Sequence, residues 1–354
     1  SFPFLSFITL LISVIPIDQF LNNHASHVAL LDTRSPAEYE HAHFPGAVSF
    51  PLMTNEQRAI IGTIYKQEGK DAAVLKGFEL IGPQFAEFVR QANTLVSDKN
   101  VALYCWRGGL RSSVMAWVLS TAGFKVTILK GGYKAFRQWV LSQFLIKKPM
   151  IVVGGKTGAG KTEMLYHLQS EGQFIIDLEK LAHHKGSAFG ALGMSAQPSS
   201  EHFENQLALQ WHQAPFSQFT WIENESIKIG KCALPVNFFD QMREAKCFEM
   251  DVSLDVRIER TLESYGKFDV DLLSDSTMKI KKRLGGLRLK MALEALEQKD
   301  LKLWCSIVME YYDKTYQHSH NKRQENEIVK VDAEGMDKST IAKEMIKLSK
   351  QVVL

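Results

Sequence analysis

One glycine-rich segment constrains the fold of this chain more than any other feature of its sequence. The apolar run Met150–Gly154 leads into GKTGAGKT, which satisfies the pattern GxxxxGK[ST]. The motif consists of Gly155, Lys156, Thr157, Gly158, Ala159, Gly160, Lys161 and Thr162. Such a segment forms a strand, a loop and a helix, in which loop amides surround a phosphate, the lysine reaches across it and Thr162 can ligate Mg²⁺. We therefore predict a parallel-sheet α/β unit with a phosphate site at this loop.

Acidic residues that follow two other apolar runs are candidates to complete this site. Asp177 follows residues 174–176, Glu223 follows residues 219–222, and Glu225 lies two positions further on. A carboxylate that works beside a phosphate loop normally ends a neighbouring strand, as Asp177 and Glu223 would. The same side chains would also serve as caps of the following elements. The sequence therefore predicts phosphate binding and leaves nucleotide hydrolysis open.

Short aliphatic runs recur along the whole chain, each followed by a turn signal and a stretch with helical spacing. This alternation is typical of α/β proteins with parallel sheets. Strands are predicted at 28–32, 101–105, 126–129, 150–153, 174–176, 219–222 and 245–250. Helices are predicted over 112–122 and 133–144, from Lys161, Phe203 and Val256, and over 289–303 and 341–353. Residues 147–149 interrupt the pattern, so we expect two domains, 1–145 and 146–354, the second with a helical C-terminal part.

A second anion site is predicted in the first domain, around a cysteine at the end of a strand. Cys105 is followed by Trp106, Arg107, Gly108, Gly109, Leu110 and Arg111, and then by a helix. Loop amides and a helix N-terminus both favour negative charge and therefore a thiolate. The glycines permit positive φ, and Arg107 and Arg111 can hold an oxyanion. Cys105 is thus predicted to be a reactive thiol, whereas the other three cysteines, Cys232, Cys247 and Cys305, lack such neighbours.

Two stretches before this loop give the first domain a family resemblance. Residues 32–39 (DTRSPAEY) and 43–47 (HFPGA) resemble the DxRSPxEY and GHxPGA signatures of rhodanese domains. The resemblance implies a rhodanese-like parallel-sheet domain whose cysteine carries a persulfide, with Asp32 and Arg34 mainly structural or at the pocket entrance. The spacing from Cys105 to Arg111, CxxxxxR, is one residue longer than the CxxGxR of common rhodaneses. In this respect the loop is similar to that of dual-specificity phosphatases built on the same fold.

The order of the two motifs adds a more specific resemblance. A rhodanese-like domain with CWRGG, followed by a P-loop domain with GKTGAGKT, resembles the tRNA 2-selenouridine synthase family over about residues 15–319. Further stretches that resemble this family are NEQRAIIGTIYKQEGK (55–70), KGGYKAFR (130–137), DLEKLAHHKGSAFG (177–190), FENQLA (203–208), WIENESIKIG (221–230) and RLGG (283–286). Leu110 replaces the Met often found in CWRGGM, which is a conservative apolar change.

The resemblance implies an enzyme that replaces sulfur by selenium at the 2-position of the wobble uridine in tRNAs that carry 2-thiouridine. It also implies selenophosphate as the selenium donor, an S-geranylated uridine made from geranyl diphosphate, and Cys105 as the essential cysteine. The enzyme that produces selenophosphate is then a candidate partner. Alkylation makes the sulfur a better leaving group, so a selenium nucleophile can displace it. The sequence leaves open whether Cys105 is selenium carrier, nucleophile or base, and where an apolar pocket for the C10 chain lies.

Residues 279–290 contain six basic side chains and no acidic one. They are Lys279, Lys281, Lys282, Arg283, Arg288 and Lys290. Such a run can bind RNA phosphates without reading bases, but it is as typical of a solvated helix face. The modified uridine would have to leave the base stack and rest on an aromatic or guanidinium plane. Trp106 offers such a plane unless its indole is buried in the core.

The composition limits which partners, cofactors and compartment are expected. With 42 Lys+Arg against 39 Asp+Glu, the net charge of +3 does not indicate nucleic-acid binding by bulk charge, so any RNA site must be local. The four cysteines form no CxxC pair, so neither a disulfide framework nor a metal site is predicted, and a reducing cytoplasm is expected. The apolar start, residues 1–14, is too short to span a bilayer, so we expect a first strand or packed segment in preference to an export signal, and no membrane partner.

Three alternative functions also fit parts of the sequence. A rhodanese-type sulfurtransferase regulated by its P-loop domain would form a persulfide from thiosulfate without tRNA. A phosphate-binding RNA scaffold would not need Cys105 at all. A CxxxxxR phosphatase would hydrolyse aryl phosphates, but it leaves the second domain unexplained.

Overall fold

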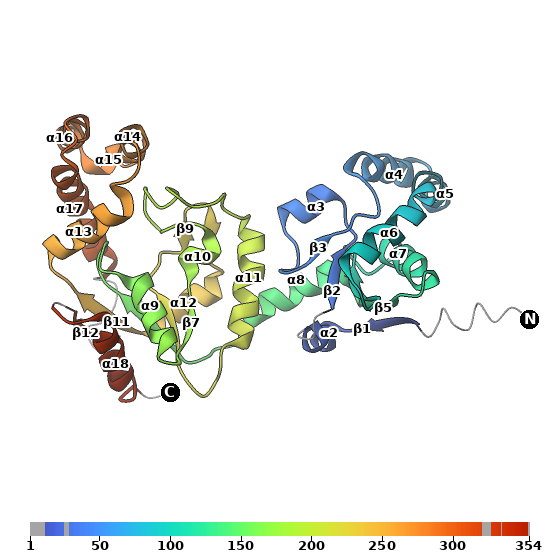
Figure 1. Ribbon diagram of the computed structural model, residues 1–354, viewed down its shortest axis with the longest axis horizontal. Helices are drawn as coiled ribbons and strands as arrows, with labels where there is room; N and C mark the ends of the chain where they lie inside the picture. Colours follow the sequence, from blue (N-terminus) through green and yellow to red (C-terminus); the bar gives the residue numbers. More distant parts are fainter. Residues whose placement is uncertain (1–10, 25–27, 321–326, 334, 353–354) are drawn as a thin grey trace, which may run out of the picture. The chain divides into compact units, whose positions relative to one another are not determined.

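The chain forms two units, each built around a parallel sheet (Figure 1). The computed structural model describes residues 11–24, 28–320, 327–333 and 335–352. The first unit ends at Ser142 and the second begins at Gln143. All strand pairs within the two five-stranded sheets are parallel, which confirms the predicted α/β class.

The sheet of the first unit has the strand order β1-β5-β4-β2-β3. Its strands are β1 (Ile12–Ile15), β2 (Ala29–Asp32), β3 (Val48–Ser49), β4 (Asn100–Tyr104) and β5 (Lys125–Leu129). The three strands predicted in this region are confirmed to within one residue. The apolar start forms the edge strand β1, which pairs with β5, while residues 1–10 lie outside the described residues. Because β4 is the middle strand, Cys105 lies at the carboxyl end of the sheet centre.

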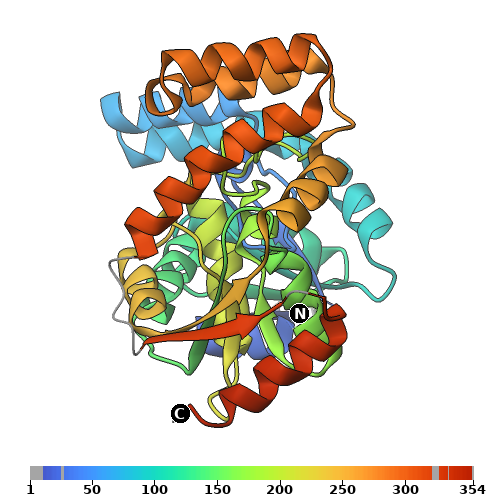
Figure 2. The ribbon, with the colours of Figure 1, turned by 90° about the vertical axis from the view of Figure 1, so that its left-hand side faces the viewer.

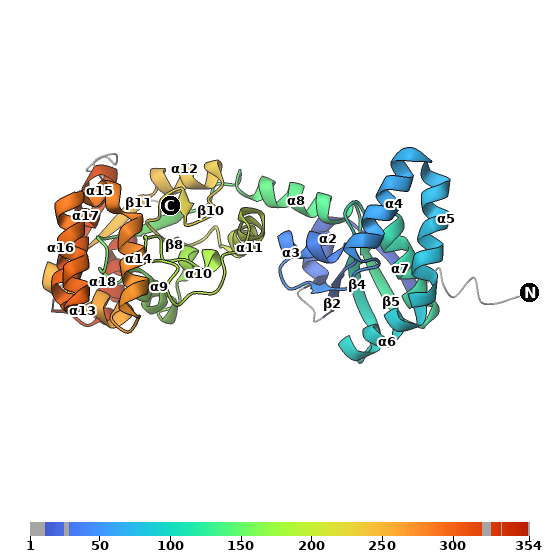
Figure 3. The ribbon, with the colours of Figure 1, turned by 90° about the horizontal axis from the view of Figure 1, so that it is seen from above.

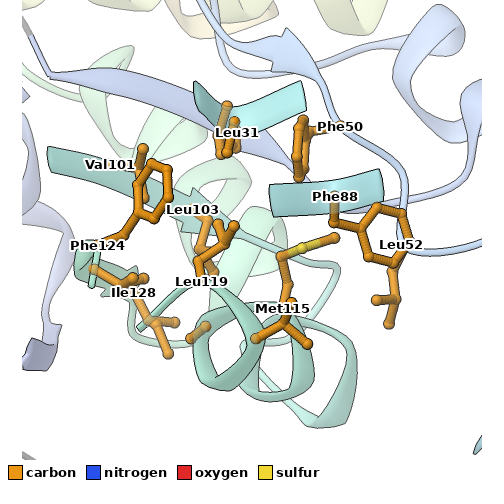
Figure 4. Packing of buried hydrophobic residues seen from close by; sticks show 14 of the residues in the cluster. Leu31, Phe50, Leu52, Phe88, Val101, Leu103, Met115, Leu119, Phe124 and Ile128 are labelled. Atoms are coloured by element: carbon orange, nitrogen blue, oxygen red, sulfur yellow. The ribbon is translucent and has the colours of Figure 1, made fainter. Parts of the chain in front are cut away.

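Helices flank this sheet, with α2, α3 and α8 on one side and α4 to α7 on the other (Figure 3). They are α2 (Ile17–His24), α3 (Pro36–His41), α4 (Asn55–Gln67), α5 (Lys70–Ile81), α6 (Phe85–Leu95), α7 (Leu110–Thr121) and α8 (Gly132–Gln143), with a 3-10 turn, η1, at Gly82–Gln84. The core packs Leu31 and Leu103 of the sheet against Met115 and Leu119 of α7 (Figure 4). α7 and α8 confirm the predicted helices at 112–122 and 133–144.

The second unit has a sheet of order β12-β11-β6-β8-β7. Its strands are β6 (Met150–Gly154), β7 (Phe174–Ile176), β8 (Thr220–Glu223), β11 (Lys246–Asp251) and β12 (Ile328–Asp332), and a separate hairpin joins β9 (Lys228–Ile229) to β10 (Cys232–Ala233). Every residue of β6 is buried, because the strand is central and covered on both faces. This burial is why its sequence is uninterruptedly apolar.

The helices of the second unit contribute to two separate hydrophobic cores. The helices are α9 (Lys161–Ser170), α10 (Leu178–Ala182), α11 (Ser200–Gln213), α12 (Val236–Glu244), α13 (Leu254–Tyr265), α14 (Val270–Lys279), α15 (Lys281–Leu284), α16 (Gly286–Glu297), α17 (Leu301–His320) and α18 (Lys338–Ser349). α9 and α18 pack with the sheet in one core. α13 to α17 form a helical group with its own core around Trp304, drawn in orange above the sheet in Figure 2.

The helix predicted over residues 289–303 is wrong in one respect, because two helices occupy this stretch. α16 ends at Glu297, Lys299 adopts a φ of 60°, and Asp300 accepts a hydrogen bond of 2.9 Å from the Leu303 amide to begin α17. A left-handed residue followed by an Asp cap ends one helix and starts the next.

The mostly helical pattern expected from Leu287 onward is also interrupted, by strand β12. β12 pairs in parallel with β11 at the sheet edge, where the short alternating sequence IVKVD has one partner strand. The helix predicted at 341–353 runs instead over Lys338–Ser349, beginning where the Asp337 side chain accepts from the Thr340 amide. Within the described part of the chain, no helix has the length and apolar character needed to cross a membrane.

Candidate functional site

The cysteine loop of the first unit occupies the carboxyl end of β4. Cys105 directly follows the strand, and α7 begins at Leu110, so the intervening residues form the predicted loop. The thiol is buried, and Cys105 Sγ lies 3.2 Å from Ser112 Oγ. Ser112 Oγ also donates to the Gly109 carbonyl over 2.9 Å. Rotation of the same hydroxyl would let it donate to a thiolate at Cys105 instead.

The cysteine loop is supported by the first residues of α8, which begins at Gly132. Tyr133 N donates to the Cys105 carbonyl over 2.8 Å, and Lys134 N donates to the Trp106 carbonyl over 2.9 Å. Gly132 has a φ of 61°, and a Cβ there would lie 2.2 Å from the Cys105 carbonyl oxygen. The stretch KGGYKAFR therefore holds the cysteine loop in place, a role that sequence reasoning did not assign.

The two arginines of the loop are placed differently. Arg107 is exposed, whereas Arg111 Nη1 donates over 2.8 Å to Glu38 Oε2, which Arg58 Nε also approaches at 3.1 Å. Burial raises the pKa of Glu38, but the hydrogen bond and charge of Arg111 outweigh this, so the pKa is lowered. Glu38 is therefore a fixed anion, and Arg111 is turned toward it.

The tryptophan of the loop is at the surface, whereas an ion pair near the loop is buried in the core. Trp106 is 38% exposed, and its ring lies 5.7 Å from that of Tyr133. Its indole therefore reaches the surface and is not a core side chain. Asp32 and Arg34 form a fully buried ion pair, with Arg34 stacked 3.8 Å over the Tyr133 ring. They are structural, as the rhodanese resemblance implies.

The phosphate loop of the second unit lies between β6 and α9. Gly155, Gly158 and Gly160 adopt φ values of 144°, 79° and 87°. Residues with a side chain rarely adopt such values, so the glycines allow the backbone to curl. Gly155 N donates to the Tyr316 hydroxyl over 2.9 Å, and Ala159 N donates to the Lys156 carbonyl over 3.0 Å. Lys161 Nζ lies 3.3 Å from the Gly155 carbonyl and so folds back over the loop. This is the arrangement expected for a cradle that receives a phosphate.

The three predicted acidic residues take distinct places near this loop. Asp177 caps α10, accepting from Lys180 N at 2.7 Å and from the Tyr166 hydroxyl at 2.6 Å. Glu223 ends β8 fully buried and accepts from Leu178 N at 2.9 Å, while its Oε1 has no hydrogen-bond partner among the described residues. Glu225 is half-buried. Both Asp177 and Glu223 thus support α10.

A fourth acid, Glu179, was missed by the sequence analysis. Thr162 Oγ1 donates to Glu179 Oε2 over 3.1 Å, so this residue is the one joined to the phosphate loop. Glu179 is the second residue of α10. In the sequence it stands out only as a member of the stretch DLEKLAHHKGSAFG, which resembles the family.

These carboxyl groups repel one another. Burial raises the pKa of Glu179, which Lys161 partly opposes. Burial, Asp177 and Glu179 raise the pKa of Glu223 well above its ordinary value. Burial and Glu179 raise the pKa of Glu225 to about 7. The site therefore combines a lysine with carboxyl groups of raised pKa, that of Glu225 lying near neutrality, which suits both anion binding and proton transfer.

Two arginines of the helical group also contact the phosphate loop. Arg257 donates to the Thr157 carbonyl over 3.2 Å and forms a two-bond ion pair of 2.8 Å with Asp313 of α17. Arg260 donates to the Ala159 carbonyl over 2.7 Å. They lie about a hundred positions from the motif in sequence, and no local pattern marked them.

The basic run 279–290 spans the end of α14, all of α15 and the first turns of α16, so it is not one helix face. Arg288 pairs with Glu310 at 2.7 Å, Lys290 lies 3.7 Å from Glu294, and Arg283 donates to the Tyr311 hydroxyl over 3.3 Å. Lys279 lies close enough to His184 to help burial lower the pKa of that imidazole. Lys281 and Lys282 are exposed and pair with no other described residue.

The remaining cysteines are buried thiols. Cys232, Cys247 and Cys305 lie in the core, and none of them forms a disulfide. Burial raises the pKa of Cys232 to about 11 and that of Cys305 to about 12, so both stay protonated at neutral pH. In the part of the chain that is described, no group of three or more His, Cys, Asp or Glu residues is arranged to hold a metal ion.

Comparison with known proteins finds a match for each unit. A family model for the tRNA 2-selenouridine synthase AAA domain matches residues 148–345, and a model for the rhodanese-like domain matches residues 17–138. The tRNA 2-selenouridine synthase of Shewanella denitrificans is 32% identical over 359 residues, covering 91% of this chain and 96% of that protein. Those of Shewanella pealeana and Hahella chejuensis are 34% and 35% identical, cover 87% and 89% of this chain, and are themselves covered to 93% and 92%. This chain therefore belongs to the tRNA 2-selenouridine synthase family.

Proposed function

We propose that the protein modifies tRNA by replacing sulfur with selenium at the 2-position of a wobble 2-thiouridine. Family membership over nearly the whole chain supports the reaction, since the curated relatives are named tRNA 2-selenouridine synthases. The observation that carries the proposal is that the chain has both loops that the route needs. Cys105 lies in the loop between β4 and α7, with its Sγ 3.2 Å from Ser112 Oγ, and Lys161 folds back over the glycine-rich loop.

The proposed route passes through an S-geranylated uridine. The thiocarbonyl sulfur attacks C1 of geranyl diphosphate, an S–C bond forms, the C–O bond breaks to release diphosphate, and the base loses its N3 proton. The selenium of selenophosphate then attacks C2 of the base and expels the geranyl thiolate. Water cleaves the P–Se bond to release phosphate, and the base takes up a proton at N3. Alkylation is useful because it turns a poor leaving group into a good one. Both donors carry phosphate, which matches a chain with two anion-binding loops.

Within this route the residues of the first unit would act on the modified base. The exposed indole of Trp106 gives an extruded uridine a surface on which to stack next to the cysteine loop. Cys105 would serve the selenium transfer, with Ser112 able to donate to its thiolate. Arg107, which is exposed, would meet the incoming oxyanion, because Arg111 is already held by Glu38.

The second unit would hold a phosphate-bearing co-substrate. Lys161 and the free loop amides would bind the phosphate, and Arg257 and Arg260 fix the loop from the helical group. A Mg²⁺ ion fits best at the pair Thr162 and Glu179, whose oxygens are the ligand type this ion prefers. There it would neutralise phosphate charge, and it would also oppose the burial and the Asp177 charge that raise the pKa of Glu179.

The tRNA would be held partly by Lys281 and Lys282, the two exposed cations of the basic run that no other described residue engages. We place the reaction in the cytoplasm, which suits four cysteines that form no disulfide. The enzyme that makes selenophosphate would supply the donor, since that compound is consumed here.

The test is a reconstitution with the full chain, 2-thiouridine tRNA, geranyl diphosphate and selenophosphate. The mass of the wobble nucleoside should change from the sulfur to the selenium form, and Cys105→Ser should abolish this change. Cys305→Ser is the matched control, because the Cys305 thiol is buried in the second unit and stays protonated at neutral pH. A protein that forms a persulfide from thiosulfate but leaves the tRNA nucleoside unchanged would instead be a sulfurtransferase.

A further inference from the structure

The first unit contains an apolar cavity of about 850 Å³ to which the proposed function assigns no ligand. It lies between the helix pair α4 and α5, the start of α7 and the core residues Leu52 and Met53. Small residues keep it open: Ala59 and Gly62 on α4, and Ala73 and Gly77 on α5. Residues three or four positions apart share one helix face, so the two small faces both border the cavity.

The charged residues of the cavity lining are all cationic. They are Arg58, Lys66, Lys70 and Arg111. Arg58 and Arg111 are held by Glu38. Lys66 and Lys70 are exposed, and neither forms an ion pair with a residue that the structure describes. The cavity is therefore an apolar space with two uncommitted positive charges at its rim.

This space adjoins the cysteine loop within the same unit. A second cavity of about 740 Å³ shares Lys70, Val74, Phe78 and Leu110 with the first and reaches Gly109. Gly109 is the last residue of the loop, and its carbonyl oxygen is the acceptor for Ser112 Oγ. An apolar ligand in these cavities would therefore lie beside the loop that carries Cys105.

The walls of both cavities carry apolar side chains that water contacts. Tyr65, Leu75, Phe78 and Leu110 are each more than half exposed. Clustered exposure of large apolar side chains is a mark of a binding surface. A ligand that covers them must be apolar over most of its length, and the lysines require an anionic end.

We propose that this cavity binds the apolar chain of an isoprenoid diphosphate, with the diphosphate at Lys66 and Lys70. The inference rests on the proposed function, because an S-prenylated uridine requires a prenyl donor near the base. The cavity volume lies within the range of about 300–1,000 Å³ usual for small-molecule sites, so a C10 chain fits with room to spare. The phosphate loop at Lys161 is then left for selenophosphate or a nucleotide.

Filling the cavity tests its apolar part. Gly62 is exposed, has ordinary helical φ, and a Cβ there meets nothing within 4 Å, so Gly62→Leu adds bulk without disturbing the fold. Calorimetric titration of the full chain with geranyl diphosphate should give a Kd about tenfold higher in the variant. Gly286→Leu, whose Cβ also meets open space but in the second unit, is the control and should bind as the wild type does.

Removing a rim charge tests the anionic end. Lys70→Ala should raise the Kd for geranyl diphosphate about threefold or more, because an exposed lysine contributes modestly to phosphate binding. Lys76→Ala is the matched control on the same helix, since Lys76 is outside the cavity and pairs with Glu79. Unchanged Kd values for both Gly62→Leu and Lys70→Ala would overturn the proposal.

Photolabelling separates this inference from the proposed function. A diazirine-bearing geranyl diphosphate should label peptides from α4, α5 and the start of α7 in the full chain. Labelling confined to the second unit, with tRNA geranylation intact, would overturn the assignment of the cavity and leave the proposed function standing. Labelling of the cavity with no modified tRNA nucleoside in the reconstitution would support the cavity and overturn the proposed route.

Discussion

At the scale of single residues, the carboxyl groups around Lys161 are the part of the site most sensitive to pH. Glu225 is the one whose pKa lies near neutrality, at about 7, raised by burial and by Glu179. Because its folded-state pKa is above its unfolded value, the protonated group stabilises the fold below about pH 4.5, and this contribution is lost as pH rises to about 7. Above that pH the buried charge is a cost.

Replacing this carboxyl group should therefore stabilise the protein in mildly alkaline solution. At about pH 8, Glu225→Gln should raise the free energy of unfolding by about 1–3 kcal/mol, because it removes a half-buried charge near Glu179. Near pH 5 the variant and the wild type should be almost equal. Urea unfolding at the two pH values measures the difference, and a pH-independent effect would contradict the role given to ionisation. Glu297→Gln, at the exposed end of α16, is the control.

Thiol reactivity is a second prediction at this scale. Iodoacetamide at about pH 8 should alkylate Cys105 well before Cys232 or Cys305, because pKa values of about 11 and 12 leave the latter two almost wholly protonated. Peptide mass spectrometry over time gives the order of labelling. Equal alkylation rates at Cys105 and Cys305 would contradict the predicted order. Reactivity of Cys232 and Cys305 should appear only in strongly alkaline solution, where they ionise.

At the scale of elements, each loop depends on a partner distant in sequence. The cysteine loop is hydrogen-bonded to the first turn of α8, while the phosphate loop is bonded by Arg257, Arg260 and Tyr316 of the helical group. Arg257 is itself fixed by Asp313, so α13, α17 and the loop form one bonded assembly within the second unit. The helical group therefore positions the phosphate site as well as adding to the core.

The support of the cysteine loop can be tested with two glycines. Gly132→Ala should lower the free energy of unfolding by about 2–4 kcal/mol and impair selenation, because its Cβ would overlap the Cys105 carbonyl as well as straining a positive φ. Gly46→Ala isolates the second effect, since Gly46 has a φ of 85° with nothing within 4 Å of its Cβ. It should cost about 1 kcal/mol. Equal losses in thermal unfolding would show that the clash at Cys105 does not matter.

At the scale of the whole molecule, the near balance of charge means that RNA affinity must come from a few cations. Within the described part of the basic run, Lys281 and Lys282 are exposed and form no ion pair, whereas Arg288 is committed to Glu310. Phosphate contacts release counterions, so each contributes to the salt dependence of binding. We therefore expect Lys281 and Lys282, two of the six basic residues of the run, to make most of its contacts with RNA phosphates.

A salt titration tests this distribution. The double substitution of Lys281 and Lys282 by alanine should reduce the slope of log K against log salt for tRNA by about 1 to 2. Arg288→Ala should have a smaller effect, because its charge is already offset by Glu310. Lys343 and Lys347 of α18, replaced together, form the control, since both pair with glutamates. An unchanged slope in the first variant would place the tRNA elsewhere.

Much of the architecture could be predicted because local rules dominate where strands are central and motifs are contiguous. β6 and its glycine loop could be located from sequence, since a buried parallel strand must be apolar and the turn must admit positive φ. Edge strand β12 escaped prediction because it is short and has one partner strand. The break at Lys299 escaped because one left-handed residue leaves no trace in hydrophobic periodicity.

The sequence alone determined the two loops, their order and the family, since each depends on residues that are neighbours in the chain. Tertiary structure decided which side chains meet: that Glu179 reaches Thr162, that Arg111 turns to Glu38, and that Gly132 lies beneath Cys105. These contacts join residues far apart in sequence, and their geometry follows from how whole elements pack. The cavity beside α4 and α5 has the same origin, because an empty space is defined by the packing of several elements and by no single motif.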